Sequence, residues 1–164
     1  MNTGQLLMAL GAMVLLSFLV LRVNGNQLST EDNMQNTKYG LLAISLANSV
    51  IEDANKRAFD NATIDNSVST ASGLTLPSKL GPESGEVYET FDDIDDYNNY
   101  TRLDSTMPSA AFNIKCSVCY VNPTTPDVAA TVQTFHKKIT VFVSSKAMRD
   151  TVKISQIFSY WNYL

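Results

Sequence analysis

The stretch LLMALGAMVLLSFLVL occupies residues 6–21, and only Gly11 and Ser17 interrupt its run of large apolar and alanine side chains. No acidic or basic residue precedes it, and Arg22 follows it directly. As a helix the stretch is about 24 Å long at roughly 1.5 Å per residue, whereas a bilayer core of about 30 Å needs roughly 20 apolar residues. The sequence therefore predicts a short membrane-crossing helix, or a helix that is also buried in another setting.

Three interpretations of this stretch stay open on the sequence alone. A cleaved secretory signal starts with positive charge and ends in small residues, but MNTGQ (residues 1–5) lacks Lys and Arg, and residues 22–26 make a poor cleavage site. A simple membrane anchor fits the composition, although the stretch is short for it. We favour a helix that packs against copies of itself, and we assign residues 1–26 to this assembly or transmembrane segment.

An amphipathic helix is expected over residues 27–59, at the start of a globular domain of residues 27–164. Ser29 or Thr30 is suited to the helix cap, and acidic residues follow in the first turn. The segment 22–26 contains glycine and two asparagines, which predicts a weak point before this helix. The alternative is one bent helix through the whole region.

Small apolar residues recur at three- and four-residue spacing in the second half of this helix, which predicts a buried stripe against a sheet. Its members are Ala43, Leu46, Ala47, Val50, Ala54 and Ala58. Glu52 and Lys56 form an expected i,i+4 ion pair on the opposite side.

The rest of the domain is expected to be a loop over residues 60–107, with a short candidate strand at 86–91, and a β-meander over 108–164. Prolines, glycines and asparagines punctuate the loop. Alternating apolar residues predict strands at 111–121, 136–145 and 152–161, and Asn122–Asp127 with two prolines predicts a turn. A long helix covering an antiparallel sheet is an α+β fold.

The N-terminal stretch MNTGQLLMALGAMVLLSFLVLRVN, followed by an amphipathic helix and a meander, resembles the type IV pilins and pseudopilins. The segment FDDIDDYNNYT (residues 91–101) is similar to a loop of some minor pilin-like sequences. The resemblance implies a mature N-terminus left after removal of a charged leader, with Met1 in place of the usual N-methylated phenylalanine. It places Gln5 where the family has a glutamate that pairs with a neighbour's terminal amine. The expected assembly residues are Met1, Gln5, Leu6, Leu10, Val14 and Phe18.

This resemblance implies a structural subunit of an extracellular, type IV pilus-like filament at a bacterial or archaeal surface. Its partners would be other copies of the chain, with the cytoplasmic membrane and the pilus assembly machinery before polymerisation. A pseudopilin of a type II-like secretion apparatus and a single-pass anchored extracytoplasmic binding domain are the alternatives.

Composition and motifs point away from nucleic-acid binding and catalysis. The net charge is −4 and the cations are scattered, so no basic patch for phosphates is expected. His136, the single histidine, lies beside two lysines, and no motif supplies a nucleophile or an orienting carboxylate for it. The sequence therefore predicts a protein without enzyme activity and without a cofactor.

Four aspartates, Asp92, Asp93, Asp95 and Asp96, lie within residues 91–97, which are called the acidic segment here. A solvated acidic loop is the favoured interpretation, because runs of like charge usually face water. The weaker alternative is a site for a hard cation such as calcium, which takes six to eight oxygen ligands.

Cys116 and Cys119 lie in one alternating apolar segment, residues 112–120. In a straight strand, residues three apart face opposite sides and are about 10 Å apart, whereas a disulfide needs Cα atoms about 4.4–6.8 Å apart. We expect free thiols with Cys116 buried, and a local bridge in a bulged strand is the alternative.

Two sequons, Asn61-Ala62-Thr63 and Asn99-Tyr100-Thr101, fall in segments expected to be exposed loops. They are candidate glycosylation sites, although such triplets arise often by chance in a chain rich in Asn and Thr.

Overall fold

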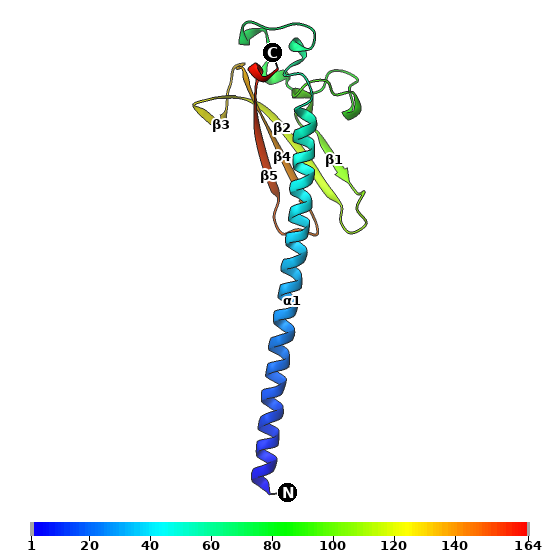
Figure 1. The fold of residues 1–164 in the computed structure, drawn as a ribbon, viewed down its shortest axis with the longest axis vertical. Coiled ribbons are helices and arrows are strands. Elements are labelled where there is room, and N and C mark those ends of the chain that lie inside the picture. The colour runs from blue at the N-terminus through cyan, green and yellow to red at the C-terminus, as the bar shows by residue number, and fades with distance from the viewer. Residues whose placement is uncertain (1, 164) are drawn as a thin grey trace. The chain divides into compact units, whose positions relative to one another are not determined.

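A computed structural model describes residues 2–163 of the chain. The chain divides into two compact units, Met1–Lys38 and Tyr39–Leu164, whereas the expected boundary lies after residue 26. Helix α1, Thr3–Ala54, runs through both units (Figure 1). Met1, an expected assembly residue, lies outside the described residues.

The first unit is an uninterrupted helix from Thr3 onward, without the weak point expected at residues 22–26. The expected cap near Ser29 and Thr30 is wrong, because both residues lie inside α1. The hydroxyl of Thr30 donates to the carbonyl oxygen of Asn26 at 2.9 Å, so it bonds within the helix instead of starting one. Ser17 bonds in the same way to Met13.

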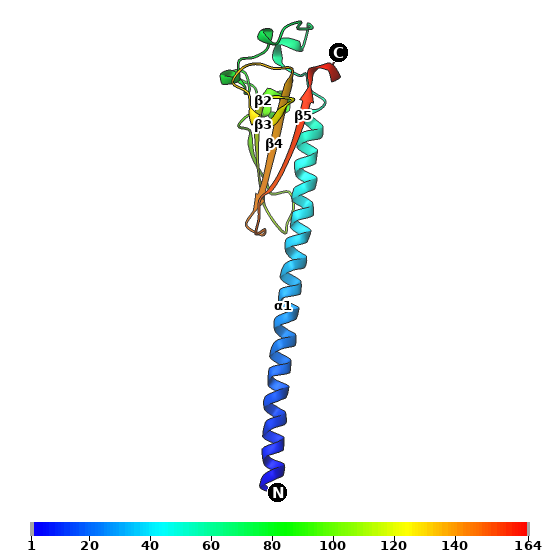
Figure 2. The ribbon, with the colours of Figure 1, turned by 90° about the vertical axis from the view of Figure 1, so that its left-hand side faces the viewer.

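In the second unit, the last part of α1 packs against one face of the sheet with small side chains (Figure 2). The expected stripe is confirmed for Ala43, Ala47, Val50 and Ala54, whereas Leu46 is only half-buried and Ala58 lies beyond the helix. The buried residues on this face are Tyr39, Ala43, Ala47, Val50, Ile51 and Ala54. Alanines let the helix backbone approach the strands closely, because they have no atoms beyond Cβ.

The helix ends at Ala54, earlier than the expected residue 59. The backbone N–H groups that follow donate to carbonyls three residues earlier, and Arg57 N–H donates to the carbonyl of Ala54 at 3.1 Å. Ala58 then leaves the helix because its backbone pairs with the acidic segment: its N–H donates to the Asp92 carbonyl, and its carbonyl accepts from Ile94 N–H. Lys56 therefore lies beyond the helix, and its ammonium group is 3.9 Å from Asp53 rather than paired with Glu52.

The sheet has five antiparallel strands in the described residues, with the order β1-β2-β4-β5 and with β3 paired to β2. The strands are β1 (Thr101–Asp104), β2 (Phe112–Asn122), β3 (Thr125–Ala129), β4 (His136–Ser145) and β5 (Val152–Ser159). Alternation is confirmed in β2 and β4, where every second residue is buried against the helix side. The α+β fold with a long helix on an antiparallel sheet is thus observed.

Three expected boundaries differ in the sheet region. Residues 101–104, expected to belong to the loop, form β1, and Pro126 lies in β3 rather than in a turn. An edge strand tolerates proline because it does not need every N–H in the ladder. The candidate strand at 86–91 is a 3₁₀ turn, Tyr88–Thr90, because the Thr90 hydroxyl and amide both bond to Val87. Strand β5 stops at Ser159, before the expected residue 161.

The segment between α1 and β1 is attached to the sheet and to itself by specific contacts. Asn98 donates from its amide nitrogen to the Leu80 carbonyl at 2.8 Å and accepts from Val118 N–H of β2 at 3.0 Å. Aromatic rings from this segment pack together, with Tyr88 stacked on Tyr100 at 4.9 Å between ring centroids. The segment is therefore an ordered part of the core rather than a free loop.

Candidate functional site

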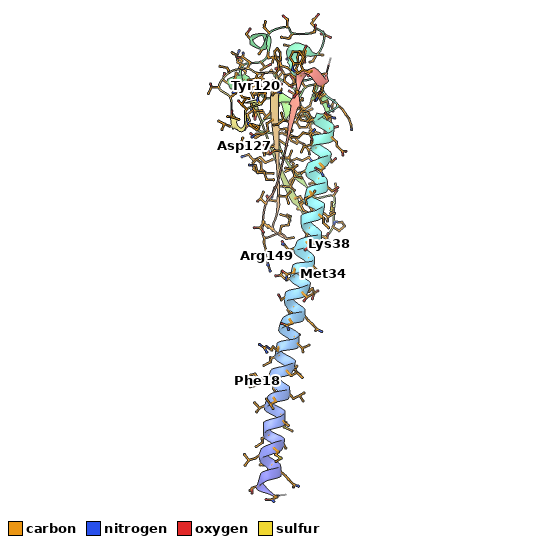
Figure 3. The ribbon with its side chains drawn as sticks, turned by 60° about the vertical axis from the view of Figure 1, so that its left-hand side comes forward. Phe18, Met34, Lys38, Tyr120, Asp127 and Arg149 are labelled. Atoms are coloured by element: carbon orange, nitrogen blue, oxygen red, sulfur yellow. The ribbon has the colours of Figure 1, made fainter. Side chains whose placement is uncertain are left out.

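The apolar helix surface, defined here as residues 6–21, is exposed along its whole length. Of the expected assembly residues, Leu6, Leu10, Val14 and Phe18 are 48–66% exposed. Figure 3 shows Phe18 projecting from the helix. Leu10, Val14 and Phe18 line one shared hollow of about 240 Å³ along the helix. A continuous apolar surface of this kind marks a site of contact with protein or lipid.

This helix is long and apolar enough to cross a membrane, and its most apolar stretch is not buried by any other part of the described chain. Its backbone groups are satisfied internally by the α-helical ladder, as a bilayer requires. The Ser17 hydroxyl, which lies inside the apolar helix surface, donates to the Met13 carbonyl at 2.9 Å. The surface can therefore be placed in a hydrocarbon environment without leaving this hydroxyl unpaired.

Gln5 lies in the first turns of α1, and its side chain is exposed. Its backbone N–H donates to the Asn2 carbonyl at 2.9 Å. The carboxamide is uncharged, with one acceptor and two donors. It can form hydrogen bonds with a neighbouring chain but no ion pair.

The glycines of the helix have no side chain, so they leave gaps between the neighbouring side chains on the helix surface. A Cβ atom added at Gly4, Gly11 or Gly25 would meet nothing within 4 Å. Packing within the described part of the chain therefore does not require glycine at these positions. The sequence reasoning gave a structural role only to Gly25, as a weak point, and named Gly11 only as an interruption of the apolar stretch. The seven-residue spacing from Gly4 to Gly11 was the available signal.

A buried charge cluster, defined as Lys137, Asp60, Asp93 and Asp95, lies in the core of the second unit. The Lys137 ammonium group donates to Asp60 Oδ2 at 2.9 Å, to the Phe59 carbonyl at 2.7 Å and to Asp95 Oδ1. The side chains of all four residues are 0–1% exposed. The cluster joins the end of the helix region, the acidic segment and β4 by charge-assisted hydrogen bonds.

Asp60 is the most completely bonded member of the cluster. Its carboxylate accepts from Ala62 N–H, from the amide and hydroxyl of Thr75, and from the Tyr120 hydroxyl at 3.0 Å. Burial by itself would raise its pKa, but the Lys137 charge and these hydrogen bonds hold the pKa of Asp60 below its ordinary value. Asp60 is therefore ionised at neutral pH.

Asp93, in contrast, is protonated at neutral pH. Burial, followed by the charge of Asp95 and a hydrogen bond to it, raises the pKa of Asp93 to about 9. Its Oδ1 accepts from the backbone N–H groups of Asp95 and Asp96, whereas its Oδ2 and Asp95 Oδ2 have no hydrogen-bond partner within residues 2–163. A proton on Asp93 relieves the repulsion between the two buried carboxyl groups.

The expectation of a solvated acidic loop is wrong for Asp93, Asp95 and Asp96, which are 0–1% exposed; only Asp92 faces water. The four aspartates are also not brought together as one metal site, because Asp95 bonds to Lys137. The sequence reasoning missed Lys137 and Asp60. A signal existed for Lys137, which occupies an inward-facing position in the alternation of β4.

The two cysteines are free, Cys116 buried and Cys119 partly exposed. Burial raises the pKa of Cys116 to about 12. Its thiol therefore stays protonated at neutral pH and is a poor nucleophile. His136 is half-buried, and its Nδ1 is 2.9 Å from the Ser159 hydroxyl across the β4–β5 pair.

Both sequon asparagines are exposed, in line with the expected loop positions. Asn99 has a positive φ of 61°, which asparagine tolerates better than most residues. The Asn61 amide nitrogen donates to Glu83 Oε1. A glycan on Asn61 would be attached to the same nitrogen and would leave it one N–H donor instead of two.

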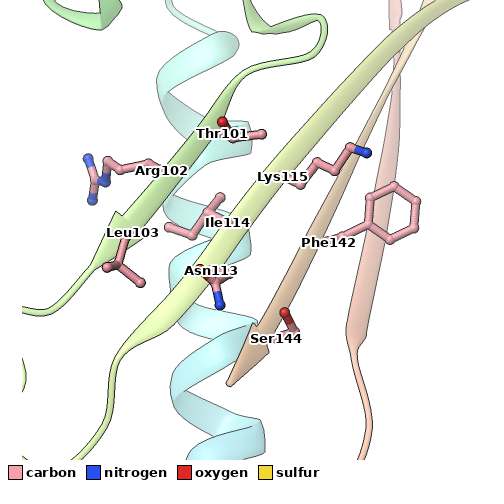
Figure 4. A pocket seen from close by; sticks show the side chains of 8 residues that line it. All are labelled: Thr101, Arg102, Leu103, Asn113, Ile114, Lys115, Phe142 and Ser144. Carbon is pink, nitrogen blue, oxygen red and sulfur yellow. The ribbon is translucent and has the colours of Figure 1, made fainter. Parts of the chain in front are cut away.

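The sheet face opposite the helix carries an open hollow of about 670 Å³ over β1, β2 and β4 (Figure 4). Lys115 is paired across the ladder with Phe142, and the Lys153 ammonium group lies 5.8 Å from the centre of the same ring. Leu103 at its edge is 62% exposed. This face combines cationic, aromatic and apolar groups.

The chain matches no protein-family model, no curated protein and no solved structure. The class of protein is therefore defined by the fold alone, an α+β domain with a long, exposed apolar N-terminal helix.

Proposed function

We propose that this chain is the structural subunit of a type IV pilus-like filament on the cell surface, polymerising through its N-terminal helix. The observation that carries the proposal is the apolar helix surface, all of which is exposed. A soluble chain cannot keep such a surface in water, so it needs lipid or other copies of itself.

In a filament outside the membrane, the removal of this surface from water is the force that holds the helix bundle together. Burying about 1,000 Å² of apolar surface from water supplies roughly 25 kcal/mol before the entropic cost of association. Before assembly the helix is held in the cytoplasmic membrane, with the sheet domain outside the cytoplasm. During assembly, helices from many copies pack into a central bundle, and the gaps at the glycines admit side chains of neighbours.

Gln5 has a defined role in this proposal. The glutamate found at this place in type IV pilins is replaced here by an uncharged carboxamide. Gln5 contributes a hydrogen bond between neighbouring subunits instead of an ion pair. Assembly would accordingly depend less on ionic strength than in a chain with glutamate at this position.

A single-pass membrane anchor for the sheet domain is the second candidate. The observation that favours it is that α1 is long and apolar enough to cross a membrane by length and composition. In that case the chain stays in the bilayer and does not polymerise.

Electron microscopy of material sheared from cells that express the chain separates the two candidates. We expect filaments labelled by antibody to the sheet domain, and no filaments with Val14→Asp, because a carboxylate in the bundle is costly to bury. Thr30→Asp is the matched control, since Thr30 is exposed in a polar part of α1. Membrane-bound chain without any filaments would contradict the proposal.

A further inference from the structure

Three carboxyl groups converge outside the buried charge cluster. Glu83 and Glu86 come from the segment before the acidic run, and Asp96 comes from the 3₁₀ turn Asp95–Tyr97. One oxygen of each lies within 4.8 Å of the others. Oxygens at this separation can share one cation, since metal–oxygen distances of about 2.3–2.6 Å span it.

A tight turn holds the two glutamates in place. Glu86 N–H donates to the Glu83 carbonyl at 3.2 Å, and Glu83 N–H donates to Glu86 Oε2 at 2.8 Å. Gly85 within the turn has a φ of 97°, a conformation that L side chains rarely adopt. Asn61 donates from its amide nitrogen to Glu83 Oε1. These bonds fix both glutamate side chains on the side of Asp96.

Asp96 supplies a separate observation that points to a ligand. Its side chain is 0% exposed. Asp96 Oδ2 accepts the backbone N–H groups of Asp92 at 2.9 Å and Asp93 at 3.1 Å, but its Oδ1 has no hydrogen-bond partner in the described chain. A buried carboxylate oxygen without a partner is costly, and the contacts of Lys137 go to other carboxylates. A cation at the glutamates would satisfy this oxygen.

We propose that Glu83, Glu86 and Asp96 bind a divalent cation, calcium. Calcium takes only oxygen ligands here, accepts irregular geometry and completes its shell with water. Zinc prefers nitrogen and sulfur ligands, and magnesium requires a near-ideal octahedron. The bound ion links the Glu83–Glu86 turn to the acidic segment and thereby to the core.

The test is calorimetric titration of calcium chloride into the full chain in detergent after treatment with a chelator. We expect one saturable site with a dissociation constant of about 0.1–1 mM, the range of extracellular calcium modules. Glu83→Gln/Glu86→Gln should weaken binding by at least about tenfold, because two of three charged ligands are lost. Glu89→Gln is the matched control: Glu89 is exposed in the same segment but outside the three groups.

Both changed glutamates lie at or near the surface, so circular dichroism of each variant checks that the fold is retained. Thermal unfolding gives a second readout, since calcium should raise the unfolding temperature of the parent and of Glu89→Gln but not of the double variant. Absence of saturable binding by the parent chain, or unchanged binding by the double variant, would overturn the proposal.

Discussion

Lys137 has its charged group fully buried, and it bonds to Asp60, Asp95 and the Phe59 carbonyl. Lys137 lies on the buried face of β4, like Ile139 and Val141. A buried ammonium group is tolerable only because each of its three protons has an acceptor. Lys137 thus links both the segment after the helix and the acidic segment to the sheet.

Lys137→Met should destabilise the second unit by about 3–5 kcal/mol, because it leaves two buried carboxylates without their cation. Urea unfolding followed by fluorescence of Trp161 measures this, since this single tryptophan contacts Phe135 at 5.2 Å between ring centroids. Lys153→Met, at an exposed position on the free sheet face, is the control and should change stability by less than about 0.5 kcal/mol. Equal effects of the two substitutions would contradict the role of the cluster.

Asp93 makes stability depend on pH in a defined direction. Its pKa is raised to about 9 in the folded chain against an ordinary value of 3.8, so the folded state binds a proton that the unfolded state releases between these values. This contribution to stability is fully present below pH 3.8 and falls as the pH rises toward 9.

Asp93→Asn keeps an acceptor oxygen for the backbone N–H groups of Asp95 and Asp96 but does not titrate. The variant should therefore gain stability relative to the parent as the pH rises, by at least about 1 kcal/mol between pH 5 and pH 8.5. Unfolding free energies at the two pH values give the comparison. A difference between variant and parent that is the same at both pH values would show that Asp93 is ionised in the folded chain.

At this scale, sequence reasoning succeeded where alternation alone decides burial, as with Cys116. It was wrong for the acidic segment because solvation of a charged run depends on what lies opposite it in space. Lys137 is far from Asp95 in the sequence, and only strand β4 brings it there.

Helix α1 continues through Gly25 and its asparagine neighbours without a break. Gly25→Ala should stabilise the helix locally by about 1 kcal/mol, because alanine has the higher helix propensity and its Cβ meets nothing within 4 Å. Hydrogen exchange of the amides of residues 22–29 in detergent should slow about fivefold. Gly40→Ala, farther along the same helix, should leave these amides unchanged, and an unchanged rate in Gly25→Ala would indicate a helix already broken there.

The elements themselves could be predicted to different degrees. The strand at 136–145 was predicted at its observed bounds, because its alternation is regular and its two ends are polar. The end of α1 could not be predicted, since Ala58 leaves the helix to pair with residues of the acidic segment. Strand β1 was missed because it is short and mostly exposed, and it exists by pairing with β2.

For the whole molecule, the simplest prediction concerns the effect of removing residues 1–26. The apolar helix surface is lost, while the second unit keeps its own core, so the truncated chain should be a soluble monomer without detergent. Sedimentation velocity measures the mass, and Trp161 fluorescence reports the fold. Filaments formed by the truncated chain would place the assembly contacts elsewhere.

Assembly through the apolar helix surface is tested most directly by electron cryo-microscopy of the assembled full chain. The account predicts a helical filament in which residues 3–21 of many copies pack at the axis and the sheet domains face outward. A filament held together by the sheet domains, with the apolar helices away from the axis, would contradict it. So would a chain that stays monomeric in the bilayer under every condition in which it is expressed.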